Sequence, residues 1–198
     1  MNTTEQILDI AKQKGLIGAN DVEEAGISRN YLYMLCNNGL LCKTAQGIYS
    51  LPDADFSEHA AIAETAKRVP RAVVCLISAL SFHGITTQLP HEVWIAVPRG
   101  AWSPRIEYPP LHLTYMSGEA YSFGIQENDI SGVSVKVYSP AKTVADCFKF
   151  RSKVGLDVAI EALRETWRSR KASMDELMEA AMICRVSKVM RPYLEASV

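Results

Sequence analysis

Residues 28–51 read SRNYLYMLCNNGLLCKTAQGIYSL, and this stretch decides the fold of the first quarter of the chain. Ser28 is of a type that caps helices, and Leu32 and Leu35 follow at a spacing that places them on one inner face. Gly39 then ends the segment, because glycine readily adopts the left-handed backbone that closes a helix. The pattern predicts a short amphipathic helix with a polar outer face.

A β-hairpin is predicted directly after this helix. Two apolar-rich segments, residues 40–44 and 48–51, are joined by a three-residue turn that ends in glycine. Upstream, the capping patterns Thr3-x-x-Gln6 and Asn20-x-x-Glu23 predict two more helices. Three helices followed by a hairpin are the order of a winged helix-turn-helix, which we predict for residues 1–52.

The rest of the chain has a different pattern. Residues 53–55 form a candidate linker, and residues 56–198 are predicted to be a second, mixed α/β domain with a helical C-terminal third. The expected fold class is therefore α+β. The strands are expected at 93–97, 111–116 and 133–138, with ambiguous segments at 73–77 and 121–125. The main helices are expected at 57–69, 78–83, from Ser139-Pro140 onward, 155–168, 173–184 and 187–196.

Composition limits the kind of protein. The chain has 198 residues, of which 48% are hydrophobic and 22% charged, as in an ordinary globular protein. No apolar run is long enough to span a membrane, and the N-terminus lacks the pattern of a secretion signal, so we expect a cytoplasmic protein. The five cysteines have no metal-site spacing, and we expect reduced thiols and no bound metal.

The outer face of the third helix is the candidate DNA-reading surface. In a helix-turn-helix the second helix of the pair enters the major groove, where asparagine can pair with adenine and arginine with guanine. The predicted DNA-binding residues, on this helix and in the hairpin, are Ser28, Arg29, Asn30, Tyr33, Asn37, Lys43 and Gln46. The alternative is a small protein-docking module whose asparagines only form a solvated face.

The charge of the N-terminal region argues against tight DNA binding by a single copy. Residues 1–55 hold four basic and seven acidic side chains, so one copy can neutralise few phosphates. We therefore expect binding by two protomers on an inverted repeat, or help from the second domain. A candidate basic patch there, for DNA or for an acidic protein surface, comprises Lys142, Lys149, Arg151, Lys153, Arg164 and Arg168. The alternative is a solvated amphipathic pair of helices with Asp157, Glu161 and Glu165 as internal partners. For Lys142 the alternative is a simple pair with Asp146, one helical turn further along.

Several motifs resemble one known family. Residues 5–53, with SRNYL at 28–32 and GLL at 39–41 through GIYSL at 47–51, resemble the N-terminal winged helix of AbiEi-type antitoxins. The second domain is similar to that family in its order of short motifs. These motifs are SALSFHGI at 78–85, QLP at 88–90, VWIAVP at 93–98 and YSPAKTVADCFK at 138–149.

The resemblance implies an antitoxin of a type IV toxin–antitoxin system, of the kind that acts in abortive infection and phage defence. Such a protein represses its own operon by binding inverted repeats in promoter DNA. Its C-terminal domain counteracts an AbiEii-type nucleotidyltransferase toxin and can support DNA binding. Whether the toxin is bound directly stays open, because type IV antitoxins are thought to act without a stable toxin complex.

Catalysis is not expected. A nucleotidyltransferase needs glycine–serine followed by an aspartate pair, and the Asp53-x-Asp55 pair has no such residues before it. No P-loop or G-x-S-x-G motif is present, so we expect no cofactor and no enzyme activity. His83 is expected to be a structural histidine. The alternative function is a stand-alone winged-helix repressor that senses a small ligand or protein partner through its second domain.

Overall fold

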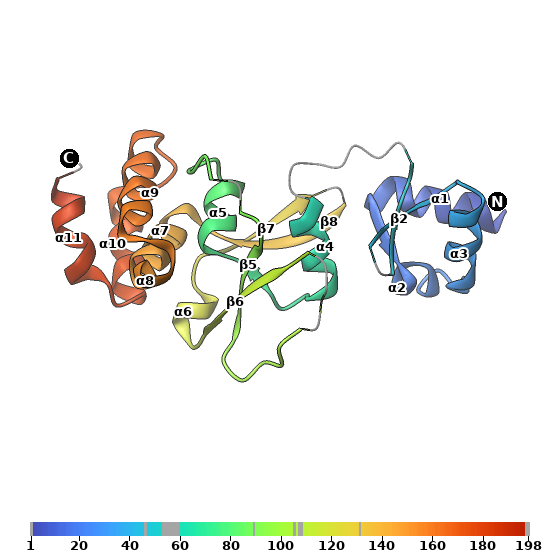
Figure 1. Ribbon diagram of the computed structural model, residues 1–198, viewed down its shortest axis with the longest axis horizontal. Coiled ribbons are helices and arrows are strands. Elements are labelled where there is room, and N and C mark those ends of the chain that lie inside the picture. The colour runs from blue at the N-terminus through green and yellow to red at the C-terminus, as the bar shows by residue number, and fades with distance from the viewer. Residues whose placement is uncertain are drawn as a thin grey trace. The chain divides into compact units, whose positions relative to one another are not determined.

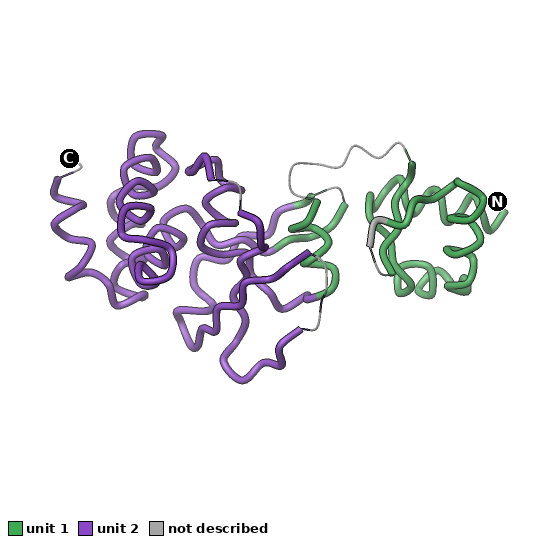
Figure 2. Tube along the Cα trace, viewed as in Figure 1, with its two compact units in different colours: residues 1–68, 129–135 green, residues 69–128, 136–198 purple. Residues whose placement is uncertain are grey.

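The computed structural model describes residues 2–45, 47–52, 60–88, 90–104, 106, 109–130 and 132–196. The chain forms two compact units (Figure 2). Unit 1 comprises residues 1–68 and 129–135, and unit 2 comprises residues 69–128 and 136–198. The predicted linker, residues 53–55, lies outside the described residues.

The N-terminal part of unit 1 combines three helices with a small antiparallel sheet (Figure 1). In chain order the elements are α1 (Thr3–Lys14), β1 (Leu16–Gly18), α2 (Ala19–Glu23), α3 (Asn30–Asn37), β2 (Cys42–Ala45) and β3 (Ile48–Ser50), and α4 (Ala60–Arg68) comes later in the unit. The sheet order is β1-β3-β2, with both pairs antiparallel. The three helices and the hairpin were expected, whereas β1 was not.

Strand β1 was not predicted from the sequence, and the reason is physical. It is three residues long and all three are buried, so it shows no alternation of polar and apolar side chains. Gly15 ends α1 with a φ of 68°, and the chain then pairs Ile17 with Tyr49 of β3. Only this pairing, made 32 residues away in sequence, identifies the segment as a strand.

Helix caps also differ from the sequence expectation by one residue. Helix α1 starts after Asn2, whose backbone N–H donates to Glu5 Oε2 at 3.0 Å, so the capping box begins at Asn2 and not at Thr3. The inner faces of the helices meet the sheet in one apolar core. That core contains Ile7, Ala11, Ile17, Val22, Ile27, Leu32, Leu35, Leu41 and Tyr49.

Unit 2 begins with a mixed α/β region that supplies most of a five-stranded sheet. The elements between residues 69 and 138 are β4 (Val73–Val74), α5 (Leu76–Phe82), β5 (Val93–Pro98), β6 (Leu111–Met116), α6 (Glu119–Ser122), β7 (Ile125–Ile130) and β8 (Val133–Tyr138), of which residues 129–135 belong to unit 1. The strand order is β6-β5-β4-β8-β7; β4 runs antiparallel to β5 and parallel to β8. The ambiguous segment 73–77 is thus a short strand followed by a helix. The strand expected near 121–125 is instead the end of α6, and β7 begins only at Ile125.

The last third of the chain is helical, as expected. It contains α7 (Pro140–Lys149), α8 (Arg151–Val154), α9 (Leu156–Arg168), α10 (Met174–Ile183) and α11 (Ser187–Glu195) (Figure 1). Ser139 caps α7 by accepting from the Lys142 N–H, with Pro140 at the first helical position. Helix α7 contacts α5, α9, α10 and α11, and every residue from Ala141 to Phe148 is buried. None of the helices in the described ranges is long and apolar enough to cross a membrane.

His83 links the end of α5 to the end of β8. Its Nε2 donates a hydrogen bond to the Tyr138 carbonyl oxygen at 2.7 Å, which confirms a structural role for this ring. Burial lowers the pKa of His83 from its ordinary 6.5, and the positive charge of Lys171 lowers the pKa further; the bond to Tyr138 opposes both effects. The folded protein therefore holds the neutral ring more strongly than the unfolded chain does.

This shift makes the stability of unit 2 depend on pH. Because the folded-state pKa lies below the unfolded one, the stabilisation is present above pH 6.5 and is lost as pH falls through the folded-state pKa. We expect the free energy of unfolding to fall by up to about 1.4 kcal/mol per pH unit in this window. Urea unfolding at pH 7, 6 and 5 should show a shallower decline for His83→Gln. The exposed His91→Gln is the control, and an equal change of slope in both variants would contradict the assignment.

Candidate nucleic-acid interface

The exposed face of α3 carries a continuous stripe of polar and aromatic side chains. Asn30, Tyr33, Met34 and Asn37 follow one another at helical spacings of three and four residues, and all four are exposed. Tyr33 is 62% exposed, although tyrosine side chains in folded proteins are usually more buried than this. The opposite face, through Leu32 and Leu35, is anchored in the core of unit 1. A well-anchored helix thus presents amides and apolar surface outward.

The N-terminal end of α3 differs from the sequence expectation. Arg29, not Ser28, occupies the cap position, and its backbone is already helical with φ −54° and ψ −22°. Ser28 Oγ accepts only a long bond from the Asn30 N–H, at 3.4 Å. Both Ser28 and Arg29 are exposed, so both side chains are free to reach outward from the start of the helix.

The hairpin brings one basic residue to this stripe. Lys43, on β2, is exposed, and its Nζ lies 5.9 Å from the centre of the Tyr33 ring. Lys43 and the α3 residues therefore lie on one surface, as a DNA-reading face formed by helix and hairpin requires. Gln46 lies outside the described residues. Sequence reasoning did not single out Tyr31, which is also 37% exposed on α3; the run Tyr31-Leu32-Tyr33 was the available signal.

Lys142 does not belong to any surface patch. Its side chain is 0% exposed, and its ammonium group pairs with the equally buried Asp146 carboxylate one turn further along α7. The Nζ also lies 4.1 Å from the centre of the Tyr138 ring. The expectation that Lys142 contacts DNA or a partner is therefore wrong, and the alternative of an internal pair with Asp146 is confirmed.

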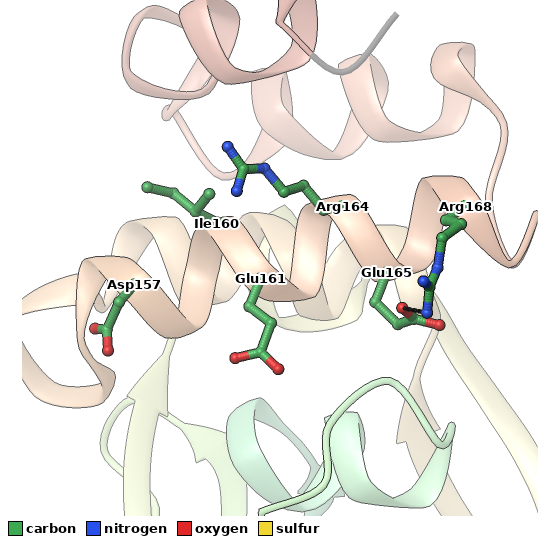
Figure 3. A pocket seen from close by; sticks show the side chains of 6 residues that line it. All are labelled: Asp157, Ile160, Glu161, Arg164, Glu165 and Arg168. Atoms are coloured by element: carbon green, nitrogen blue, oxygen red, sulfur yellow. Dashed lines mark hydrogen bonds and ion pairs between the residues drawn. The ribbon is translucent and has the colours of Figure 1, made fainter.

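Arg164 and Arg168 lie on a face of mixed charge. With Ile160 they line a hollow along α9 together with Asp157, Glu161 and Glu165 (Figure 3). Arg168 donates to Glu165 at 2.6 Å, and three carboxylates share this surface with two guanidinium groups. This end of the predicted basic patch is thus a mixed-charge face, which matches the solvated alternative.

The other predicted basic residues gather elsewhere with one that was missed. Lys149 and Arg151 line a pocket of about 700 Å³ together with Arg185, from the turn between α10 and α11. Lys153 is exposed nearby in sequence, with its Nζ 5.8 Å from the Phe150 ring that Lys149 also approaches. No local pattern marks Arg185, because it is 34 residues from Arg151 and joins it only through helix packing.

Other candidate features are structural. Trp94 stacks on His112 with ring centres 3.7 Å apart. Three cysteines, Cys75, Cys147 and Cys184, are buried, and burial raises the pKa of each thiol, so they stay protonated. The part of the chain that the structure describes contains no group of three or more potential metal ligands.

Comparisons with known proteins bear on the N-terminal quarter and on the fold. Residues 5–52 match the family described as transcriptional regulator, AbiEi antitoxin, which confirms the resemblance over that stretch and supports a regulatory role of the antitoxin type. No curated protein matches the chain. The crystal structure of the RV2827C protein from Mycobacterium tuberculosis is similar with a TM-score of 0.62 and 12% identity. The match covers 98% of this chain and 80% of that one, so the two share a fold.

Proposed function

We propose that this protein is a cytoplasmic, DNA-binding antitoxin that represses its own operon. The observation that carries the proposal is the exposed α3 stripe within a segment that matches a family of antitoxin-type regulators. The element order α1-β1-α2-α3-β2-β3 supports a winged helix-turn-helix, in which α3 enters the major groove and the β2–β3 hairpin is the wing.

The chemistry of the stripe favours A·T base pairs. Asn30 and Asn37 can each donate to and accept from an adenine edge, and Tyr33 and Met34 offer apolar surface to a thymine methyl group. Arg29, at the start of the stripe, is suited to guanine. Ser28 and Lys43 lie at its margins, where they are placed to contact phosphates.

Weak phosphate neutralisation favours two copies on DNA. Arg29 and Lys43 are the basic residues of the proposed contact surface, and a module with so few phosphate contacts binds weakly alone. Two protomers on an inverted repeat double the contacts and place the two α3 helices about one helical turn, roughly 34 Å, apart. The operator should therefore be an inverted repeat in promoter DNA.

We assign the antitoxin function to the second domain, acting against an AbiEii-type nucleotidyltransferase. The protein itself is proposed to be no enzyme and to need no cofactor. A second candidate is a stand-alone repressor that senses a small ligand through unit 2. The pocket formed by Lys149, Arg151 and Arg185 favours this candidate, since it is a place for such a ligand.

Promoter binding and toxin rescue test the proposal together. Footprinting with the full chain on DNA upstream of its own gene should protect an inverted repeat cooperatively. Co-expression with a neighbouring nucleotidyltransferase gene should restore growth. Protection of a single half-site without cooperativity would contradict dimeric binding. Promoter binding without rescue would remove the antitoxin role and leave the repressor.

A further inference from the structure

Three cationic side chains from separate elements of unit 2 converge on one pocket. Lys149 is the last residue of α7, Arg151 the first of α8, and Arg185 lies in the turn that joins α10 to α11. The pocket has a volume of about 700 Å³ and its other wall is the loop and short helix at residues 117–120. This volume lies within the roughly 300–1,000 Å³ typical of small-molecule sites.

The charge of this pocket is not neutralised from within. Glu119 is the one acidic residue among the described residues that line it, against three cations. In the described ranges of the chain, neither Lys149, Arg151 nor Arg185 forms an ion pair with a carboxylate. Arg151 is held in place by donating from Nη1 to the Phe148 carbonyl at 2.9 Å. Its remaining donors are available to a ligand.

Arg185 occupies a backbone position that favours glycine. Its φ is +59°, and its N–H bonds the Met182 carbonyl while the next N–H reaches back to Ala181, which is the usual way a helix closes. Gly39 and Gly84 hold the equivalent positions after α3 and α5. A side chain at positive φ costs free energy relative to glycine, so the backbone of Arg185 is strained.

We propose that this pocket binds the phosphoryl group of a small phosphorylated molecule. Two arginines and a lysine supply charge-assisted donors, and guanidinium groups match the oxygen geometry of a phosphate. A hollow formed by three elements favours a compact ligand over the extended backbone of a duplex, which fits a flat basic surface better. This site lies in unit 2, so the inference goes beyond the proposed DNA-binding function, and it gives the ligand of the second candidate function a chemical class. Binding to the pocket can be tested without DNA.

A matched pair of variants tests the assignment. Arg170 follows α9 as Arg185 follows α10, with a φ of +55° and the same pattern of closing hydrogen bonds, but it does not line this pocket. Both Arg185→Gly and Arg170→Gly relieve backbone strain and should raise the urea midpoint of unfolding. Only Arg185→Gly removes a ligand contact, and it should weaken binding by at least about tenfold.

Isothermal titration calorimetry with ATP, inorganic pyrophosphate and inorganic phosphate gives the readout. The full chain and Arg170→Gly should bind at least one probe with equal affinity, and Arg185→Gly should bind it at least tenfold more weakly. If Arg185→Gly does not fold, Lys149→Gln carries the same expectation. Absence of binding to every probe overturns the proposal, as does equal weakening by Arg170→Gly. Binding of a short DNA duplex, lost in Arg185→Gly while no small probe binds, also overturns it and assigns the surface to nucleic acid.

Discussion

Lys142→Met should destabilise unit 2 by about 3–5 kcal/mol, because it leaves a buried carboxylate without its counter-charge. Both Lys142 and Asp146 are 0% exposed, and they pair directly. Cys184 Sγ, 3.3 Å from Asp146 Oδ1, is the other donor to this carboxylate that the structure describes. A thiol is a weak donor, so it cannot replace the ammonium group.

Burial is the dominant influence on this carboxylate and raises the pKa of Asp146 even with Lys142 present. Without the ammonium group the acid must either stay charged in an apolar core or take up a proton. Both outcomes cost stability at neutral pH. The loss is a large share of the 5–15 kcal/mol that typically separates folded from unfolded proteins.

The double variant Lys142→Met/Asp146→Leu provides the control. It removes both charges and fills the space with apolar groups, so it should recover most of the lost stability. Urea unfolding followed by tryptophan fluorescence reports on the correct part of the chain, because Trp94, Trp102 and Trp167 all belong to unit 2. A loss below about 1 kcal/mol in the single variant would mean that the pair is solvated.

Removing both stripe asparagines should abolish sequence-specific DNA binding. Each bidentate amide–adenine pair is worth about 1–3 kcal/mol of discrimination, so Asn30→Ala and Asn37→Ala should each weaken operator binding by roughly 5- to 150-fold. The two residues lie seven positions apart on α3 and contact different base pairs in this scheme, so their effects should add in the double variant.

Fluorescence anisotropy with a labelled operator and with a scrambled duplex separates the contributions. The double variant should bind the operator no more tightly than the scrambled duplex, whereas non-specific affinity and its salt dependence should stay unchanged. Asn20→Ala, on the exposed surface of α2, is the matched amide control and should retain specificity. Specific binding that survives in the double variant would exclude α3 as the reading element. Stability should not change, since neither side chain is buried.

Local periodicity accounts for what could be predicted about α3. Leu32 and Leu35 mark the inner face, so the outward direction of Asn30, Tyr33 and Asn37 follows from helix geometry alone. Capping residues are equally local signals. They predicted the starts of α7 and α10 at Ser139 and Ser173 correctly. The missed β1 is a three-residue segment that exists only through its pairing with β3.

The basic residues of the second domain show what local sequence spacing cannot predict, namely which side chains are buried. The spacing of Lys142 and Asp146 is compatible both with an exposed pair and with a buried one, and only the packing of α5, α9, α10 and α11 around α7 buries it. Arg164 and Arg168 share a helix face with Asp157, Glu161 and Glu165. Sequence spacing left both a basic patch and this mixed-charge face open.

The sequence by itself determined most of the helices, the β2–β3 hairpin and the outward face of α3, because helix caps and hydrophobic period act over a few neighbouring residues. The tertiary structure decided which charged side chains are buried and which lie at the surface, where they can contact a ligand. It placed Lys142 in the core, where its ammonium group pairs with Asp146 and lies over the Tyr138 ring. It also brought Arg185, 34 residues after Arg151, to the same pocket as Lys149 and Arg151. The burial of one side chain and the convergence of three others depend on packing between segments far apart in sequence, which no local pattern predicts.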